Sequence, residues 1–325
     1  MNIRLLAGAA LGAAAALSAA SVCSAQTSDP PPAWAFPLNP PAKPPSGPSH
    51  PDRREHVPGS PVTYTDRQLD DEFFTPDWFP TDHPPLPTIV ASGRKPAMPC
   101  GLCHLASGNG GPAEAALPGL PASYIVEQVQ EFRAGRRAAA QPAMQAAHDM
   151  VLEAKAVSDT DLAAAARYFS RLGFISRFHV VETATAPKVH VGGVSLYMKT
   201  PGAGTEPLGE RIVEVPDDTH QCELGNAHGD FTAYVPKGSI ARGEKLVASG
   251  DGAAPCRSCH GPDLTGVGNI PPLAGRSPSY LARQLYDIQH GSRHGPVVAP
   301  MLPEVAHITP ADRIAIVAYL ASLRP

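Results

Sequence analysis

The chain has 325 residues and a formal net charge of −4 at pH 7. This length is enough for two small domains with connecting segments, and the acidic balance argues against nucleic acid as a partner. Only 6% of the residues are aromatic whereas 38 are proline, which fits stiff connectors and a core filled partly by a non-protein group. No stretch beyond the first 25 residues is apolar over a bilayer-spanning length, so we expect a soluble mature chain without a stable membrane span.

The first segment, residues 1–25, has the pattern of a Sec signal peptide. Arg4 gives a positive start, residues 5–20 form an alanine- and leucine-rich apolar run, and residues 23–25 form a small-residue cleavage site. An uncleaved anchor is the weaker alternative because the apolar run is short, and lipidation at Cys23 is disfavoured by the valine before it. We therefore expect cleavage of this segment and a periplasmic mature protein.

Proline is frequent in the next two segments. Residues 26–61 include twelve prolines and almost no periodic apolar residues, so we expect an extended spacer with partial polyproline character. From residue 62 aromatic residues reappear, but five prolines between positions 76 and 87 exclude a long helix. We predict one short helix over 65–73 and a strap, within 64–94, that packs on the domain that follows it.

Two Cys-x-x-Cys-His pentapeptides, at 100–104 and 256–260, are the strongest signal in the chain. Cysteines at i and i+3 lie on one face of a short helix, so both thiols can reach the two vinyl groups of one porphyrin while the next histidine binds the iron. Zinc knuckles or local disulfides are the alternatives, but zinc knuckles usually lie about 15 to 20 residues apart. Here the motifs lie 156 positions apart. We predict two covalent haems with these attachment and proximal-ligand residues: Cys100, Cys103, His104, Cys256, Cys259 and His260.

An internal repeat links the two motifs. An offset of 156 residues superimposes the pentapeptides and several later residues: Gly119 on Gly275, Tyr124 on Tyr280, Gly135 on Gly291 and Arg137 on Arg293. Beyond that point the offset is 151, which aligns Met150 with Met301 and leaves five extra residues in the first copy. The repeat predicts two homologous domains.

Each copy is expected to end in a helix with clear start signals. Thr309 is an N-cap residue followed by Pro310 and, at the third helical position, by Asp312. Ser158 and Asp161 repeat this pattern in the first copy, and apolar residues then recur at helical spacing. Middle helices are predicted to begin near residues 123 and 279.

At these residues the second copy resembles a class I cytochrome c domain, through its pentapeptide, its Pro-Pro-Leu-Ala-Gly segment at 271–275 and its terminal helix. The whole chain resembles the periplasmic dihaem cytochromes c that are built from two such domains. The resemblance implies a mainly α fold with two class I cytochrome c domains in tandem and a short β-containing insertion between them. The expected boundaries are 62–177 for the N-terminal domain with its strap, 178–236 for the insertion and 237–325 for the C-terminal domain.

In that family a methionine before the last helix is the distal iron ligand, which implies Met301 in the second copy and Met150 in the first. Met144 is the rival in the first copy. Nearby histidines that would instead give a bis-histidine haem are His148, His290, His294 and His307. The family also orients the proximal imidazole with a proline carbonyl, a role that Pro271 fits, whereas Ala115 stands at the matching position of the first copy.

The first copy departs from the family pattern in two further ways. Leu105 stands where the second copy has Gly261, and prolines at 84, 85 and 87 occupy the positions of the usual N-terminal helix. These unequal surroundings predict unequal reduction potentials for the two haems.

The insertion matches nothing in the two-domain pattern. Alternating runs at 189–191 and 211–215, bounded by glycine and proline, predict short strands. His220, Cys222 and His228 are candidates for a metal site, and Cys222 for a thiolate haem ligand, although an ordinary polar loop is the simpler interpretation. Haem attachment is expected to use the other four cysteines of the mature chain, so Cys222 has no partner for an intramolecular disulfide. A disulfide between two chains is the bond that stays open to it.

Together these features favour a periplasmic electron-transfer protein and not an enzyme. An iron held by histidine and methionine is coordinatively saturated, so it changes oxidation state readily but does not easily bind a substrate. The expected donor is a periplasmic dehydrogenase or a quinol-oxidising complex, and the expected acceptor is a terminal oxidase or reductase. Two alternatives stay open: a dihaem enzyme of the peroxidase or thiosulfate-oxidising type, and a permanent cytochrome subunit of a dehydrogenase complex.

Overall fold

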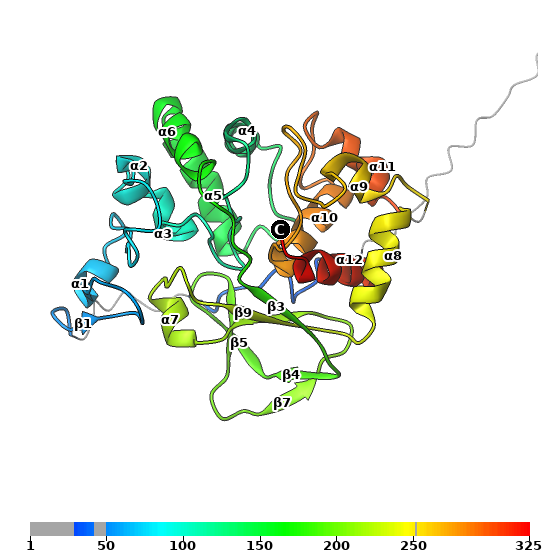
Figure 1. Ribbon diagram of the computed structural model, residues 1–325, viewed down its shortest axis with the longest axis horizontal. Coiled ribbons are helices and arrows are strands. Elements are labelled where there is room, and N and C mark those ends of the chain that lie inside the picture. The colour runs from blue at the N-terminus through cyan, green and yellow to red at the C-terminus, as the bar shows by residue number, and fades with distance from the viewer. Residues whose placement is uncertain (1–28, 42–49, 251) are drawn as a thin grey trace, which may run out of the picture. The chain divides into compact units, whose positions relative to one another are not determined.

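The computed structural model describes residues 29–41, 50–250 and 252–325, whose path is drawn in Figure 1. The expected signal peptide lies outside the described residues. None of the described helices is both long and apolar enough to cross a membrane. Residues 31–325 pack as one compact unit, so both copies of the repeat and the insertion share a continuous structure.

Helices dominate both copies of the repeat. The first copy contains α2 (Thr88–Ala91), α3 (Cys100–His104), α4 (Ala122–Arg133), α5 (Gln145–Ala156) and α6 (Asp159–Phe169). The second contains α8 (Ser239–Ser249), α9 (Cys256–His260), α10 (Pro278–Gln289), the 3-10 helix η1 (Ala299–Met301), α11 (Leu302–Val305) and α12 (Pro310–Ser322). The counterpart of the eleven-residue α8 is only the four-residue α2, as the prolines of the first copy predict.

Side-chain caps begin the terminal helices where the sequence predicts them. The Thr309 hydroxyl accepts from the Asp312 amide before α12, and the Ser158 hydroxyl accepts from the Asp161 amide before α6, both at 3.1 Å. The Asp312 carboxylate also accepts from the Thr309 amide, which completes a capping box. A second capping box, at Thr65, begins the short helix α1 (Asp66–Leu69). Each cap satisfies backbone N–H groups that have no partner within the helix.

Small sheets make up most of the insertion. β3 (Phe178–Glu182) pairs in parallel with β9 (Phe231–Val235), and β8 (Val213–Pro216) pairs antiparallel with β9. Two antiparallel pairs lie between them in sequence: β4 (Thr185–Pro187) with β7 (Thr205–Pro207), and β5 (Val189–Gly192) with β6 (Leu196–Lys199). The helix α7 (Thr219–Glu223) precedes β9. The two predicted strands are therefore present, while the pair of β1 (Arg54–Glu55) and β2 (Tyr64–Thr65), outside the insertion, is not predicted by the sequence.

The proline-rich strap joins the first copy to the insertion. The Trp78 indole is buried and donates to the Leu224 carbonyl of the insertion at 2.7 Å. On the other side, the Thr75 hydroxyl donates to the Val90 carbonyl at 2.8 Å. Thr75 also lies against the first pentapeptide so closely that a Cβ on Gly101 would come within 2.6 Å of the Thr75 methyl group. Glycine at this pentapeptide position is therefore required by the strap.

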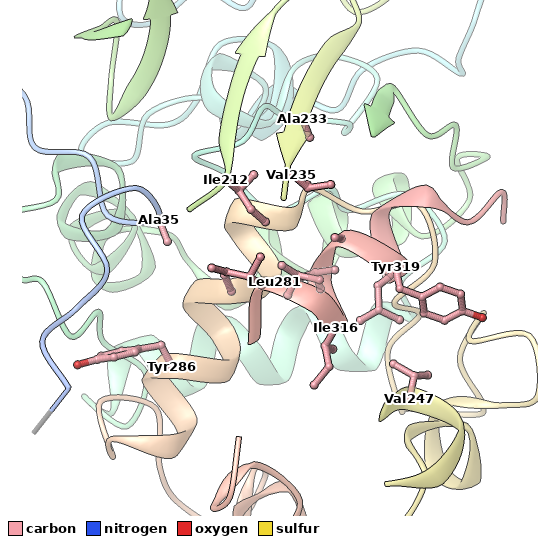
Figure 2. Close-up of a cluster of buried hydrophobic side chains, with 14 of the residues drawn as sticks. Ala35, Ile212, Ala233, Val235, Val247, Leu281, Tyr286, Ile316 and Tyr319 are labelled. Atoms are coloured by element: carbon pink, nitrogen blue, oxygen red, sulfur yellow. The ribbon is translucent and has the colours of Figure 1, made fainter. Parts of the chain in front are cut away.

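The main core surrounds α12, which packs against α8 and α10. Figure 2 shows part of it, with these side chains labelled: Ala35, Ile212, Ala233, Val235, Val247, Leu281, Tyr286, Ile316 and Tyr319. Ala35 and Phe36 come from the segment that we expected to be only a spacer, yet they are 0% and 2% exposed. Phe36 packs edge-on against Tyr286, with ring centroids 5.7 Å apart. Part of this segment therefore belongs to the core of the second copy, because its apolar residues Ala35 and Phe36 are buried there.

Equivalent residues of the two copies meet each other. Arg137 and Arg293 form an isolated antiparallel bridge and are both buried. Arg137 donates to Gln128 (3.0 Å), Tyr280 (2.9 Å) and Gln284 (3.2 Å), and Arg293 donates to Gln284 (3.0 Å), Tyr124 (3.2 Å) and Gln128 (2.8 Å). Since each partner is matched by the residue 156 positions away, the contact is symmetric in its chemistry. The repeat detected in the sequence is thus also the basis of the contact between the copies.

Candidate functional site

Each pentapeptide forms a short helix, α3 or α9, that is preceded by a proline. The residue after each histidine has a positive φ, 63° at Leu105 and 87° at Gly261. Glycine adopts this conformation freely, whereas a leucine held there costs about 1–3 kcal/mol. The first pentapeptide therefore carries backbone strain that the second avoids.

A backbone carbonyl holds the histidine of each pentapeptide. The Nδ1 atom of His104 lies 2.9 Å from the Ala115 oxygen, and that of His260 lies 2.8 Å from the Pro271 oxygen. A carbonyl only accepts, so Nδ1 carries the proton and the neutral ring has its lone pair on Nε2, as iron ligation requires. Burial lowers the pKa of both imidazoles, an effect that these hydrogen bonds oppose, and so favours the neutral form. The hydrogen bond expected at Pro271 is present, and Ala115 accepts the matching bond in the first copy.

A cavity of about 650 Å³ adjoins the first pentapeptide. Cys100, Cys103 and His104 form part of its largely apolar wall. The volume lies in the range of about 300–1,000 Å³ that is usual for ligand and cofactor pockets. Both cysteines are free thiols, so they are available for thioether bonds. The size, the apolar wall and the donor set of this cavity fit a covalently attached haem.

Four methionines line the same cavity: Met98, Met144, Met150 and Met198. Met144 is 1% exposed and is the N-cap residue of α5, whereas Met150 is half-buried within α5. Met301 of the second copy lies eight residues before the N-cap of the terminal helix, and Met150 has the same spacing to its own cap. Met301 is also the N-cap residue of α11, a position that Met144 shares in the first copy. Met144 and Met150 thus each have one structural likeness to Met301.

The rival histidines lie elsewhere. None of them belongs to the described wall of the first cavity, and His148 is exposed on α5. His290 stacks on Tyr286, with ring centroids 3.9 Å apart, and its Nδ1 lies 3.0 Å from the Tyr286 carbonyl oxygen. His294 and His307 are exposed. For the first haem, these positions leave the methionines as the better candidates for the distal ligand.

The three candidate metal ligands of the insertion are not brought together. His228 pairs with Asp82 at 2.7 Å, and His220 lies 3.7 Å from Glu55. Within the described part of the chain, no group of three or more His, Cys, Asp or Glu side chains is arranged to hold a metal ion. Cys222, by contrast, lines the first cavity, where burial raises the pKa of its thiol to about 12. This thiol is therefore protonated at neutral pH.

The insertion closes the first cavity, which the sequence did not predict. Met198 of β6 and Phe231 of β9 form part of its wall, as does Arg177, which lies directly before the insertion. These residues lie far from the pentapeptide in sequence and follow no repeat. No sequence pattern identifies them, because only the folded insertion places them beside His104.

The chain is similar to several known proteins. The family model described as cytochrome c matches residues 240–324. A relative named thiosulfate dehydrogenase electron acceptor, from Thiomonas intermedia strain K12, is 28% identical over 245 residues, which are 73% of this chain and 83% of the relative. Cytochrome c4 of Azotobacter vinelandii is 28% identical over 213 residues, 63% of this chain and 74% of the relative. The solved structure of thiosulfate dehydrogenase TsdBA from Marichromatium purpuratum has a TM-score of 0.45 at 25% identity and matches 70% of this chain, which spans 37% of that structure.

Residues 240–324 therefore form a cytochrome c domain, and the cofactor is covalently bound haem c. The chain is similar to cytochrome c4 and to the protein named thiosulfate dehydrogenase electron acceptor. The count of two haems follows from its two pentapeptides.

Proposed function

We propose that this protein is a periplasmic electron carrier in which histidine and methionine hold each of the two haem irons. The proposed axial ligands are His104 with Met150 and His260 with Met301, and the proposed thioether links are made by Cys100, Cys103, Cys256 and Cys259. The observation that supports this function is the wall of the first cavity, on which a neutral imidazole and methionine side chains face one space. An iron with both axial positions filled has no open position for a substrate.

Haem supplies the one-electron chemistry, and the residues of this chain set its conditions. The hydrogen bond from Nδ1 to a carbonyl fixes the ring orientation and makes the imidazole a stronger donor. The apolar wall keeps water away from the first site. Because Leu105 and Ala115 replace the glycine and proline of the second site, we expect the two reduction potentials to differ.

The electron donor that we propose is a periplasmic dehydrogenase, with a terminal oxidase or reductase as acceptor. The name of the relative from Thiomonas intermedia, thiosulfate dehydrogenase electron acceptor, favours a dehydrogenase over a quinol-oxidising complex as donor. Transient redox partners usually bury little area and depend on complementary charge. Association with such a donor is therefore expected to weaken as the salt concentration rises.

A second candidate function is that of a permanent cytochrome subunit of a dehydrogenase. Apolar side chains are exposed on and just before the insertion: Ile175 (69%), Val181 (42%) and Val194 (43%). Permanent interfaces are more apolar than transient ones, so these residues favour a lasting contact. Purification from the native host in about 1 M salt, where charges are screened beyond about 3 Å, separates the two roles. A carrier is expected to elute alone, and a permanent subunit to retain its dehydrogenase.

Ligand binding and turnover separate a carrier from an enzyme. The reduced wild-type holoprotein is expected to bind carbon monoxide slowly or not at all, and to show negligible peroxidase or thiosulfate-oxidising turnover, while still exchanging electrons with small mediators. Cys222→Ser is expected to leave both haem spectra unchanged. Turnover by the wild type, together with loss of one haem signature in this variant, would instead identify a thiolate-ligated catalytic haem.

A further inference from the structure

The loop that holds the first proximal histidine lacks the prolines of its counterpart. In the second copy Pro271 supplies the carbonyl that accepts from His260, and Pro272 follows it, so two pyrrolidine rings restrict the backbone there. The first copy has Ala115 and Ala116 at these positions. Alanine leaves both backbone dihedrals free, so the local sequence alone does not fix the direction of the Ala115 carbonyl.

Three arginines bind this loop, residues 110–118, from both sides of Ala115. Arg177 donates to the Gly110 carbonyl, Arg283 donates to the carbonyls of Pro112 (2.6 Å) and Ala113 (3.1 Å), and Arg276 donates to those of Ala116 and Pro118 (3.1 Å to Pro118). Among the hydrogen bonds of the described residues, no arginine donates to the matching loop at 266–274. The loop that has alanine in place of both Pro271 and Pro272 is therefore the one to which the arginines donate.

Burial makes these contacts obligatory for the arginines as well. The three guanidinium-bearing side chains are only 4–5% exposed. A buried charge is costly unless its N–H groups are satisfied, and hydrogen bonds from a charged donor are roughly twice as strong as neutral ones. Arg276 also lies over the Phe174 ring at 4.5 Å from its centroid, and Arg177 over the Phe231 ring at 5.3 Å. Loop and arginines thus hold each other in place.

Two of the three arginines come from the second copy: Arg276 lies just before α10, and Arg283 lies within α10. Arg177 lies between α6 and β3. We propose that these arginines are positioning residues for the first haem, which keep the Ala115 carbonyl aligned with the Nδ1–H of His104. Through α10 the second copy thereby controls the proximal ligand of the first haem. This role rests on the proposed function, because it requires haem bound at His104.

The positive charge of the arginines and their positioning of the Ala115 carbonyl have opposite effects on the reduction potential of the first haem. A well-aligned carbonyl makes the imidazole a stronger donor and so stabilises ferric iron, which lowers the potential. A nearby positive charge stabilises ferrous iron, which raises the potential. Arg276→Lys keeps the charge but loses the planar fork that spans two carbonyls. This variant therefore isolates the effect of position.

The test uses the full-length holoprotein carrying Arg276→Lys. In the reduced, diamagnetic state, NMR is expected to show exchange of the His104 Nδ1 proton with solvent accelerated about tenfold, while the His260 proton is unchanged. The first haem, followed by its own methyl signals during potentiometric titration, is expected to show a raised midpoint potential. Arg313→Lys changes another buried arginine of the second copy, which donates to Gln289, and is expected to leave His104 unaffected.

A rescue variant distinguishes a specific role of the arginines in positioning the Ala115 carbonyl from a general loss of structure in the loop. The Ala115 amide donates no hydrogen bond among the described residues, so Ala115→Pro is compatible with the loop in this respect. Added to Arg276→Lys, it is expected to restore slow exchange and the original potential. The positioning role would be overturned if proton exchange at His104 were unchanged in both Arg276→Lys and Arg283→Lys. It would also be overturned by equal changes at both haems, or if Ala115→Pro failed to restore slow exchange and the original potential. Absence of the first haem from the wild-type holoprotein would refute the proposed function instead.

Discussion

Arg137 and Arg293, which occupy the same position in the two copies, pair with each other through their backbones. Two buried like charges are tolerated here because each guanidinium donates to glutamine and tyrosine oxygens of both copies. The acceptors of this network therefore determine how firmly the copies are joined.

Removing one acceptor is expected to destabilise the protein. Tyr280→Phe deletes the hydroxyl that accepts from Arg137 at 2.9 Å and leaves a buried N–H group unsatisfied. We expect a loss of about 1–3 kcal/mol in the free energy of unfolding, measured by denaturant titration of the oxidised holoprotein. Tyr234→Phe is the control, since the Tyr234 hydroxyl makes no hydrogen bond among the described residues. An equal loss in both variants would show that the network contributes nothing specific.

The distal ligand of the first haem is expected to be Met150. Its spacing to the terminal helix matches that of Met301, so Met150→Ala is expected to abolish one of the two His/Met charge-transfer signals of the oxidised protein. Met144→Ala is expected to leave both signals, although it creates a cavity that costs about 2–5 kcal/mol of stability. The reverse spectroscopic result would assign the ligand to Met144, whose place before α5 resembles that of Met301 before α11.

The cap of α12 is expected to contribute measurably to stability. Thr309→Ala removes the side chain that accepts from the Asp312 amide and breaks the capping box, at a cost of about 1 kcal/mol. Thermal unfolding followed by circular dichroism is expected to show a Tm lowered by about 2–4 °C. Thr309→Ser keeps the hydroxyl and is expected to retain most of the wild-type Tm. A similar decrease in both variants would attribute the effect to the lost methyl group.

Buried Glu214 is expected to make stability depend on pH. Its Oε2 accepts from the Ser277 hydroxyl and the Ser279 amide, both at 3.0 Å. Burial raises the pKa of this carboxyl, and the hydrogen bonds from Ser279 and Ser277 and the charge of Arg283 oppose that rise. The unfolded chain releases the proton near pH 4.3 while the folded chain still holds it, so stability falls as pH rises from about 4.3 through the raised pKa.

Glu214→Gln removes this titration and is expected to flatten the decline in the free energy of unfolding, measured between about pH 4 and pH 8. One such group contributes a slope of at most about 1.4 kcal/mol per pH unit. Glu210→Gln, at an exposed position, is the control and is expected to keep the wild-type profile. A wild-type profile for Glu214→Gln as well would exclude this carboxyl as the source.

The parts of the site that depend on nearby residues were predictable from the sequence. The separation between His104 and Ala115 recurs between His260 and Pro271, so the repeat alone identifies both carbonyl partners. The cap at Thr309 follows from side chains within four residues of each other. Such features need only local spacing.

Features that depend on distant residues were not predictable. The apolar residues Ala35 and Phe36 stand alone among prolines, so no periodicity indicates that they are buried. Arg276 and Arg283 follow no motif, and their bonds to loop 110–118 exist only because α10 packs beside that loop. Alternating residues indicate a strand such as β8, but they do not indicate that its partner is β9.

The parallel pairing of β3 with β9 has a consequence for the length of chain between the two haem domains. Phe178 lies opposite Phe231 and Glu182 opposite Val235, so the chain runs in the same direction along both strands, which lie about 4.8 Å apart. The insertion therefore adds only the span of one five-residue strand, about 17 Å, to the path toward α8. The lengths of its hairpins therefore do not set the separation between Phe178 and Val235, the two ends of this path.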